Sequence, residues 1–267
     1  MFTLLFPQID PVIFAVGPFA VRWYALAYIA GLFGGLWYMR WMVKRPPALM
    51  TPAQVDDFML WALGGVVLGG RLGYVLFYKA GYYAQHPLEI FKTWEGGMSF
   101  HGGLLGVTLA ILLYARHAKI EKWYLGDLIG CAAPIGLGLG RIANFINGEL
   151  WGREAPGVPW AMIFPGAGEV PRHPSQLYQA GLEGVTLFLI MHFCWRNESI
   201  RRRPGILTGV FWIGYGVFRS IGEFFREPDS FLGFLIGGAT MGQLLSLPMI
   251  LFGVFCIWRA RRAPAVG

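Results

Sequence analysis

The chain has 267 residues, of which 55% are hydrophobic and only 14% are charged. Soluble domains carry about 25% charged residues, so this composition excludes a water-soluble enzyme and indicates a protein that lies mostly in lipid. The net charge of +7 is typical of basic cytoplasmic loops in such a protein, and we expect no nucleic-acid partner.

Seven apolar stretches approach the roughly 20 residues that a helical membrane span requires. They cover residues 17–39, 56–78, 99–115, 125–142, 175–195, 205–222 and 236–258. The first eighteen residues contain no Lys or Arg, so we expect a retained membrane helix and not a cleavable signal peptide. The sequence therefore predicts an all-α integral membrane protein, with a single polytopic domain over residues 1–267 and an outer loop at about 143–173.

Basic residues divide unevenly between the loops on the two sides of these predicted spans. One side carries Arg40, Lys44, Arg45, Arg116, Lys119, Lys122, Arg196, Arg201, Arg202, Arg203, Arg259, Arg261 and Arg262. The other side carries only Lys79, Lys92, Arg153, Arg172 and Arg226. The positive-inside rule then predicts an N-terminus outside and a C-terminus in the cytoplasm, which agrees with an odd number of spans.

The unusual polar residues of the predicted spans gather toward the outer side. His101 begins the third span, Arg141 ends the fourth, Glu223 ends the sixth, and Tyr24 lies near the outer end of the first. Ionisable groups at membrane depth are costly and usually face a cavity or a substrate. We therefore expect one polar site that opens outward.

The run from Gly140 to Arg153 carries two arginines, two amides and a carboxylate out of the fourth span. The planar guanidinium of Arg141 suits bidentate binding of phosphate oxygens, and the amides of Asn144 and Asn147 can bind hydroxyl groups. The alternative is a loop anchor whose arginine reaches to the membrane interface. We favour an anionic ligand, because glycines before the arginine allow close approach.

Tyr215, Arg219, Glu223 and Arg226 are spaced by 4, 4 and 3 residues, so on a helix they form one polar stripe. The alternative is an internal ion pair between Arg219 and Glu223 that only helps helices to associate. An arginine at the centre of a span costs roughly 2.5–3.5 kcal/mol, whereas an intramembrane polar contact contributes about 0.6 kcal/mol on average. This balance favours a functional stripe.

Other features have structural interpretations. The spacing of Gly65 and Gly69 lets membrane helices approach closely, and Asp127 lies near a cytoplasmic helix start, where a carboxylate interacts well with the helix dipole. Glu183 lies in the middle of a span and indicates an interior polar partner that the sequence does not identify. The three cysteines are widely spaced in apolar stretches without a metal-ligand pattern, so we expect small core residues.

Four motifs resemble the prolipoprotein diacylglyceryl transferase family, and the similarity covers essentially the whole chain. They lie at residues 96–103, 140–153, 172–178 and 215–229 and include His101, Arg141, Arg219 and Glu223. Ala143 is a small departure, since the family commonly has glycine there. The resemblance implies a seven-span enzyme of the bacterial inner membrane with its active site toward the periplasm. We expect no metal and no cofactor.

The resemblance also implies a reaction and its partners. A diacylglyceryl group passes from phosphatidylglycerol, a membrane lipid, to the lipobox cysteine thiol of a prolipoprotein, and glycerol phosphate is released. In the family, the residues that match His101, Arg141, Asn144, Arg219 and Glu223 lie at or near the active site. Tyr24, Glu149, Gly152 and Tyr215 match further important positions, and we expect Asn147 and Arg226 to bind substrate as well.

Within this hypothesis, Arg141 clamps the lipid phosphate, Arg219 stabilises the leaving phosphate, and Glu223 orients Arg219 or takes a proton. Converting the cysteine thiol to a thiolate at pH 7 costs about 2 kcal/mol, which a positioned base can offset. His101 is the first candidate for this base, and Glu223 or Tyr215 could serve instead.

Alternatives come from other classes of protein. An anion transporter with an arginine-lined path predicts polar residues that continue to the cytoplasmic side and often a paired repeat; the sequence shows neither pattern. A phospholipid headgroup transferase predicts an outer cluster of metal-binding aspartates, which this chain lacks. A purely structural role in lipoprotein assembly predicts that Arg141 is replaceable.

Overall fold

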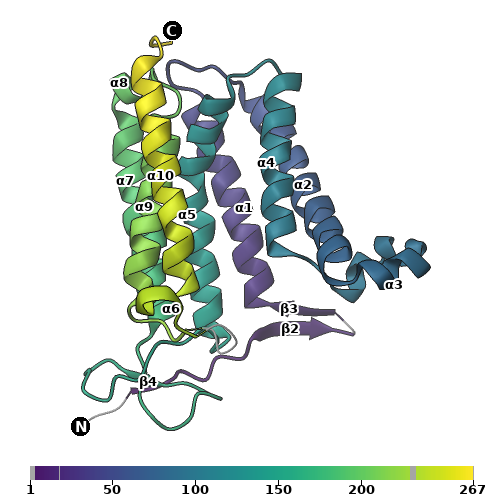
Figure 1. The fold of residues 1–267 in the computed structure, drawn as a ribbon, viewed down its shortest axis with the longest axis vertical. Coiled ribbons are helices and arrows are strands. Elements are labelled where there is room, and N and C mark those ends of the chain that lie inside the picture. The colour runs from purple at the N-terminus through teal and green to yellow at the C-terminus, as the bar shows by residue number, and fades with distance from the viewer. Residues whose placement is uncertain (1–3, 18, 229–232, 267) are drawn as a thin grey trace. The chain divides into compact units, whose positions relative to one another are not determined.

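The computed structural model describes residues 4–17, 19–228 and 233–266, and its contacts divide the chain into two compact units. The larger unit comprises residues 1–39 and 127–267, and the smaller comprises residues 40–126. Both are built mainly from helices, and Figure 1 labels α1 to α10 together with the strands β2, β3 and β4.

Long helices make up most of the larger unit. They are α1 (Trp23–Met42), α5 (Lys122–Ile146), α7 (Leu187–Arg196), α9 (Ile206–Glu223) and α10 (Met241–Arg262). α6 (Ser175–Gln179) and the π-helix η3 (Ala180–Thr186) run directly into α7, so Ser175–Arg196 is one continuous helix. The short helices α8 (Glu198–Arg201) and η4 (Ile236–Gly238) precede α9 and α10.

The larger unit also contains two small β-ladders. β1 (Leu4–Leu5) pairs in parallel with β4 (Met162–Ile163), and β2 (Val12–Val16) pairs antiparallel with β3 (Phe19–Arg22). The prediction of an all-α fold with a span from residue 17 is therefore wrong here, because the helix begins only at Trp23. The apolar run before Trp23 is rich in Val, Ile and Phe, which favour strands, and hydropathy alone does not separate a strand from a helix.

Capping and glycine packing fix the start and the position of α10. Thr240 and Gln243 form a capping box, with each side chain bonded to the backbone N–H of the other, so the helix begins at Met241 and not at the predicted residue 236. A Cβ added to Gly209 of α9 would lie 2.5 Å from the carbonyl oxygen of Gly253. Only a glycine contact lets α9 and α10 approach this closely.

The smaller unit is a pair of long helices joined by short helical turns. Its elements are α2 (Pro52–Tyr78), α3 (Ala80–Gln85), η1 (Pro87–Phe91), η2 (Thr93–Glu95) and α4 (Phe100–His117). A Cβ on Gly65 would lie 2.6 Å from the carbonyl oxygen of Gly106, and one on Gly73 would lie 2.7 Å from the Cα of Gly102. The predicted close approach through small residues of α2 is therefore confirmed.

Replacing Gly106 with alanine should destabilise the protein by about 1–3 kcal/mol, the usual cost of overpacking. Its new Cβ would lie 2.9 Å from the Cα of Gly69 and closer still to the backbone of Gly65, so α2 and α4 would have to separate. Gly64→Ala is the matched control, because a Cβ there meets nothing within 4 Å. Unfolding in mixed micelles measures both variants, and equal stability of the two would contradict the packing argument.

The lengths and surfaces of the helices agree with a protein in lipid. α2, α5, Ser175–Arg196 and α10 are each long and apolar enough to cross a membrane. α1, α4 and α9, with 20, 18 and 18 residues, overlap the remaining predicted spans. Large apolar side chains lie exposed on the helices, among them Phe77, Leu105 and Phe193, as expected for a surface covered by lipid.

Candidate functional site

Five charged side chains of the larger unit form a series of alternating sign. Nε and Nη2 of Arg141 each donate to Oε2 of Glu183 over 3.3 Å. Nη1 of Arg219 lies 3.8 Å from Oε1 of Glu183, and its Nη2 lies 2.7 Å from Oε1 of Glu223. Nη1 of Arg226 lies 3.8 Å from the same Glu223 oxygen. We call this cluster the arginine–glutamate network. It contains three cations and two anions, so its net charge is one positive charge.

The stripe predicted on α9 is confirmed for Arg219 and Glu223, which lie one helical turn apart. It does not continue along the helix, because α9 ends at Glu223 and Arg226 lies beyond it in a backbone bridge with Gly152. Arg226 instead reaches back from the loop to Glu223. The other oxygen of Glu223, Oε2, accepts a 2.6 Å hydrogen bond from the hydroxyl of Thr240.

The amides after Arg141 hold the chain itself. α5 continues to Ile146, past the predicted end at residue 142, so Arg141 and Asn144 both lie on the helix and the loop begins at residue 147. Nδ2 of Asn144 and Nδ2 of Asn147 donate to Oε1 of Glu149 at 2.8 and 3.3 Å. Nε2 of Gln176 donates to the backbone oxygen of Glu149 at 2.6 Å. These bonds fix the first turn of the loop against the start of α6.

Gly152 lies where two backbone segments meet. Its N–H donates to the carbonyl oxygen of His173 at 2.9 Å, and a Cβ would lie 2.5 Å from that oxygen and 2.6 Å from the carbonyl oxygen of Phe225. Nε and Nη2 of Arg153 donate to the carbonyl oxygens of Arg226 and Glu223, both at 3.0 Å. The structure thus gives Gly152 a packing role, in which the outer loop fastens the end of α9.

Two tyrosines lie near the charges of this region. Tyr215 of α9 interacts electrostatically with Glu183, Glu223 and both arginines of α5 and α9. Tyr24, in the first turn of α1, lies 3.4 Å from the hydroxyl of Tyr28 and interacts electrostatically with Glu149 and Arg141. Both predicted positions therefore belong to the same region of the larger unit as the network.

His101 belongs to the smaller unit, in the first turn of α4 after the N-cap Ser99. The loop before it is fixed by Arg71, a buried side chain that donates to the carbonyl oxygens of Glu89, Ile90 and Gly96 at 2.7, 2.7 and 2.6 Å. Arg71 therefore pairs with three backbone carbonyl groups of this loop and holds it against α2.

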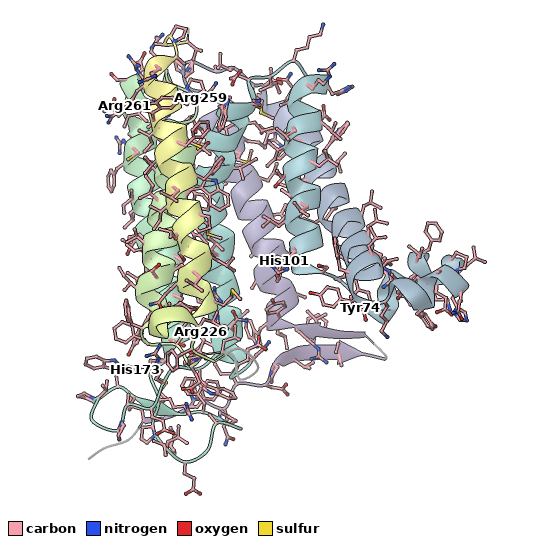
Figure 2. The ribbon with its side chains drawn as sticks, viewed as in Figure 1. Tyr74, His101, His173, Arg226, Arg259 and Arg261 are labelled. Atoms are coloured by element: carbon pink, nitrogen blue, oxygen red, sulfur yellow. The ribbon has the colours of Figure 1, made fainter. Side chains whose placement is uncertain are left out.

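The two ends of the larger unit differ in charge. Figure 2 shows Arg226 and His173 at one end of its helices and Arg259 and Arg261 at the other. Arg203 donates to the carbonyl oxygen of Arg261 at 3.0 Å, so the basic loop before α9 lies beside the basic end of α10. The arginine–glutamate network therefore lies toward the end of this unit opposite its most basic loops.

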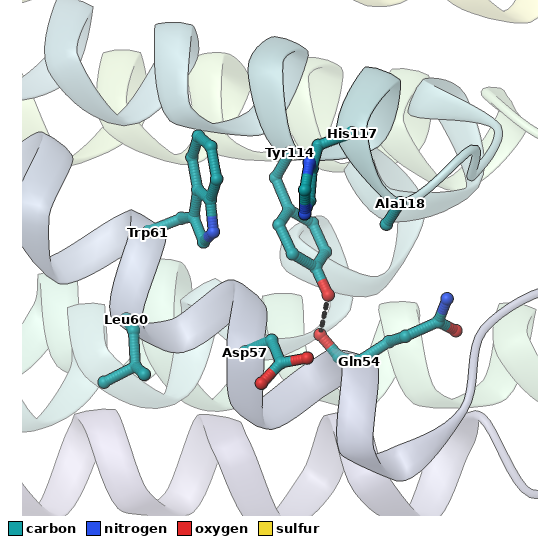
Figure 3. A pocket seen from close by; sticks show the side chains of 7 residues that line it. All are labelled: Gln54, Asp57, Leu60, Trp61, Tyr114, His117 and Ala118. Carbon is teal, nitrogen blue, oxygen red and sulfur yellow. Dashed lines mark hydrogen bonds between the residues drawn. The ribbon is translucent and has the colours of Figure 1, made fainter.

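The part of the chain that the structure describes contains no cluster of three or more His, Cys, Asp or Glu side chains that could hold a metal ion. The smaller unit has a cavity of about 280 Å³ between α2 and α4, shown in Figure 3. Asp57, Trp61 and His117 line it, and the Tyr114 hydroxyl donates to the backbone oxygen of Gln54 at 2.7 Å. It contains none of the predicted site residues.

Sequence reasoning missed one residue that contacts the network, Thr240, and did not identify the partner of another, Glu183. Thr240 reaches Glu223 from the start of α10, and its Thr-x-x-Gln capping pattern could have placed it at a helix start. Glu183 was expected to need a polar partner, and the structure supplies two, Arg141 and Arg219. No pattern along the chain indicates which helices are neighbours.

His173 should make stability depend on pH. Burial lowers the pKa of this imidazole below its ordinary value, so the unfolded chain takes up a proton first as the pH falls through about 6.5. Stability contributed by the neutral ring is present above that pH and is lost below it. The unfolding midpoint of the protein should fall more between pH 7 and pH 5 than that of His173→Gln; parallel curves would contradict this origin.

Comparisons with known proteins agree with the motifs. Residues 11–259 match the family described as prolipoprotein diacylglyceryl transferase. A phosphatidylglycerol–prolipoprotein diacylglyceryl transferase of Paramagnetospirillum magneticum is 60% identical, over 98% of this chain and 97% of its own. Proteins of the same name are 56% identical in Rhodospirillum rubrum, over 98% and 96%, and 55% identical in Azospirillum brasilense, over 99% of both chains.

Proposed function

This chain belongs to the prolipoprotein diacylglyceryl transferase family, and we propose that it transfers the diacylglyceryl group of phosphatidylglycerol to the lipobox cysteine of prolipoproteins. This transfer is the first step of bacterial lipoprotein maturation. We place the enzyme in the inner membrane with seven spans, its N-terminus outside and its active site toward the periplasm. The position of the arginine–glutamate network, opposite the basic loops of the larger unit, supports this orientation.

The transfer forms one bond and breaks one. The substrate thiol gives its proton to a base, and the sulfur attacks the diacylglycerol carbon that carries the phosphate oxygen. The carbon–oxygen bond breaks with its electron pair on the phosphate, so the products are a thioether and glycerol phosphate. The protein must therefore bind an anionic headgroup, stabilise the charge that develops on the leaving phosphate, and help to form the thiolate.

The arginines of the network meet the first two requirements. Arg141 pairs with Glu183 through Nε and Nη2, and Arg219 pairs with Glu223 and Glu183 through Nη2 and Nη1, while each arginine side chain keeps 16% of its surface exposed. Each arginine therefore combines ion pairing inside the protein with exposed surface toward a phosphate, and donors held in this way are most effective in a water-poor site. We assign Arg141 to binding the lipid phosphate in the substrate complex and Arg219 to stabilising the charge on that same phosphate as it leaves.

Glu223 is best suited to orienting Arg219. One of its oxygens lies 2.7 Å from Arg219 and the other accepts the Thr240 hydroxyl, so both are already engaged. We therefore propose His101 as the base, with Tyr215 as the alternative. A His101→Gln enzyme that keeps near-normal turnover would exclude the histidine.

The remaining predicted residues form the walls of the proposed site. Asn144 and Asn147 fix Glu149, and Gly152 lets the outer loop approach the end of α9. Tyr24 and Tyr215 interact electrostatically with the charged groups, and Arg226 adds positive charge beside Glu223. We propose that together they orient the headgroup and the lipobox segment.

The observation that carries this proposal is the partly buried network with one net positive charge, whose two central arginines each keep 16% of their side-chain surface exposed. The test is the purified protein in nanodiscs that contain phosphatidylglycerol, supplied with a lipobox peptide and analysed by mass spectrometry. We expect a thioether-linked diacylglyceryl peptide together with glycerol phosphate, and no product from a peptide whose cysteine is replaced by serine. An unmodified peptide with intact lipid would overturn the proposal, and anion flux in proteoliposomes would then support the transporter.

A further inference from the structure

Glu183 is the side chain that joins the two arginines proposed to bind phosphate. It is fully buried, with a side-chain exposure of 0%, whereas Arg141 and Arg219 each keep 16%. A carboxylate without exposed surface does not touch a substrate that reaches the arginines from outside. Its contacts are instead with the guanidinium of Arg141, at 3.3 Å, and with that of Arg219, at 3.8 Å.

The local backbone is built to bring this carboxylate to that place. Glu183 lies in the π-helical segment η3, between α6 and α7, and π-helical turns are rare and frequent at functional sites. A Cβ added to the neighbouring Gly184 would lie 2.5 Å from the Cα of Gly138 on α5. Gly138 precedes Arg141 by one helical turn, so this close backbone contact sets the distance between Glu183 and Arg141.

Electrostatics explain why the position requires a carboxylate. Two guanidinium groups near one site repel each other, and a buried charge is stable only when it is paired. Glu183 offers one oxygen to each arginine and so holds both toward the same point. Without it, the network would gain net positive charge but lose the group that fixes the positions of Arg141 and Arg219.

We propose that Glu183 is a positioning residue that aligns Arg141 and Arg219 for the same phosphate, an inference that rests on the proposed function. The arginines bind the headgroup, and Glu183 determines where their guanidinium groups lie. Loss of its charge should therefore affect the chemical step more than the attraction of an anionic lipid, because the network becomes more positive while its geometry loosens.

The central variants are Glu183→Gln and Glu183→Asp, compared with Glu198→Gln as control. Glu198 also pairs with an arginine, Arg202 at 2.8 Å, but that pair is largely exposed. We expect Glu183→Gln to lower kcat at least 100-fold while KM for phosphatidylglycerol changes less than threefold. Glu183→Asp keeps the charge and the fold, but its side chain is one methylene shorter. Its kcat should therefore lie between that of Glu183→Gln and that of the unmodified enzyme. Glu198→Gln should match the unmodified enzyme.

Two further measurements separate positioning from a general structural role. In an Arg219→Lys background, Glu183→Gln should lower kcat by less than a further tenfold. Both changes disturb the same group of interacting side chains, so their effects are not additive. Independently of activity, the arginine Nε–H resonances of Arg141 and Arg219, assigned from their lysine variants, should shift in Glu183→Gln and not in Glu198→Gln.

A kcat of Glu183→Gln within threefold of the unmodified enzyme, multiplicative losses with Arg219→Lys, or unshifted resonances would each overturn the inference. Absence of thioether product from the unmodified enzyme would instead overturn the proposed function, while the resonances would still test the bridge.

Discussion

Replacing Arg219 with lysine should lower turnover roughly 10²–10³-fold, the usual effect of removing one preorganised donor to a developing negative charge. Nη2 of Arg219 lies 2.7 Å from Glu223, and its Nη1 faces Glu183 at 3.8 Å without a hydrogen bond. An ammonium group keeps the positive charge between the two carboxylates, so the protein should remain folded. The ammonium group lacks the planar guanidinium fork, which can contact both carboxylates and still donate to a phosphate.

The control for this change is Arg202→Lys. Arg202 also pairs with a glutamate one turn away, Glu198, at 2.8 Å, but it lies on a basic loop outside the network, so turnover should be unchanged. Single-turnover formation of the thioether, measured with saturating phosphatidylglycerol, separates the chemical step from substrate binding. An Arg219→Lys enzyme within tenfold of the original rate would show that charge at this position is sufficient and that fork geometry is not required.

The helices could be predicted largely because their signal is local. About 20 apolar residues in a row indicate a span whatever lies beside them, and α2 and the continuous helix Ser175–Arg196 lie close to their predicted positions. The spacing of the small residues Gly65 and Gly69 likewise predicts close packing of α2 against another helix. The start of α1 was wrong because β2 and β3 are as apolar as a span, so that only pairing with a neighbouring strand distinguishes them.

The site could be predicted as a set of residues but not as a set of contacts. Arg219 and Glu223 were paired correctly because both lie on one helix, one turn apart. The bond between Arg141 and Glu183 joins residues 42 positions apart, and it depends on which helices are neighbours. Glu183 lies in a π-helical turn. A π-helical turn does not change the apolar pattern of a membrane span in a recognisable way, so the spacing of residues could not predict where this carboxylate lies.

Asp127 should be the most important single polar residue for stability. It was expected to favour the dipole of its own helix, α5, but its carboxylate instead caps α9. Its oxygens accept the N–H groups of Gly205 and Thr208 at 2.8 and 2.6 Å and the Thr208 hydroxyl at 2.7 Å, and the residue is 1% exposed. Asp127→Ala would leave these donors buried without an acceptor, so we expect a loss of about 2–4 kcal/mol.

Asp127 also joins the two helices that carry the proposed phosphate-binding arginines, at the end remote from them. Arg141 follows Asp127 by 14 residues, which is about 21 Å along α5 at 1.5 Å per residue. Asp127→Ala should therefore lower the midpoint of unfolding in mixed micelles and the amount of folded enzyme, while turnover per folded molecule stays near its original value. Asp127→Asn, which keeps one acceptor oxygen, should lose less than the alanine variant, and Asp56→Ala, which removes an exposed pair with Arg40, should change stability by no more than about 0.5 kcal/mol. If turnover per folded molecule fell as steeply as stability, the Asp127 cap would affect the arginine–glutamate network along the length of both helices. The inference that Asp127 serves stability alone, remote from the reaction, would then be wrong.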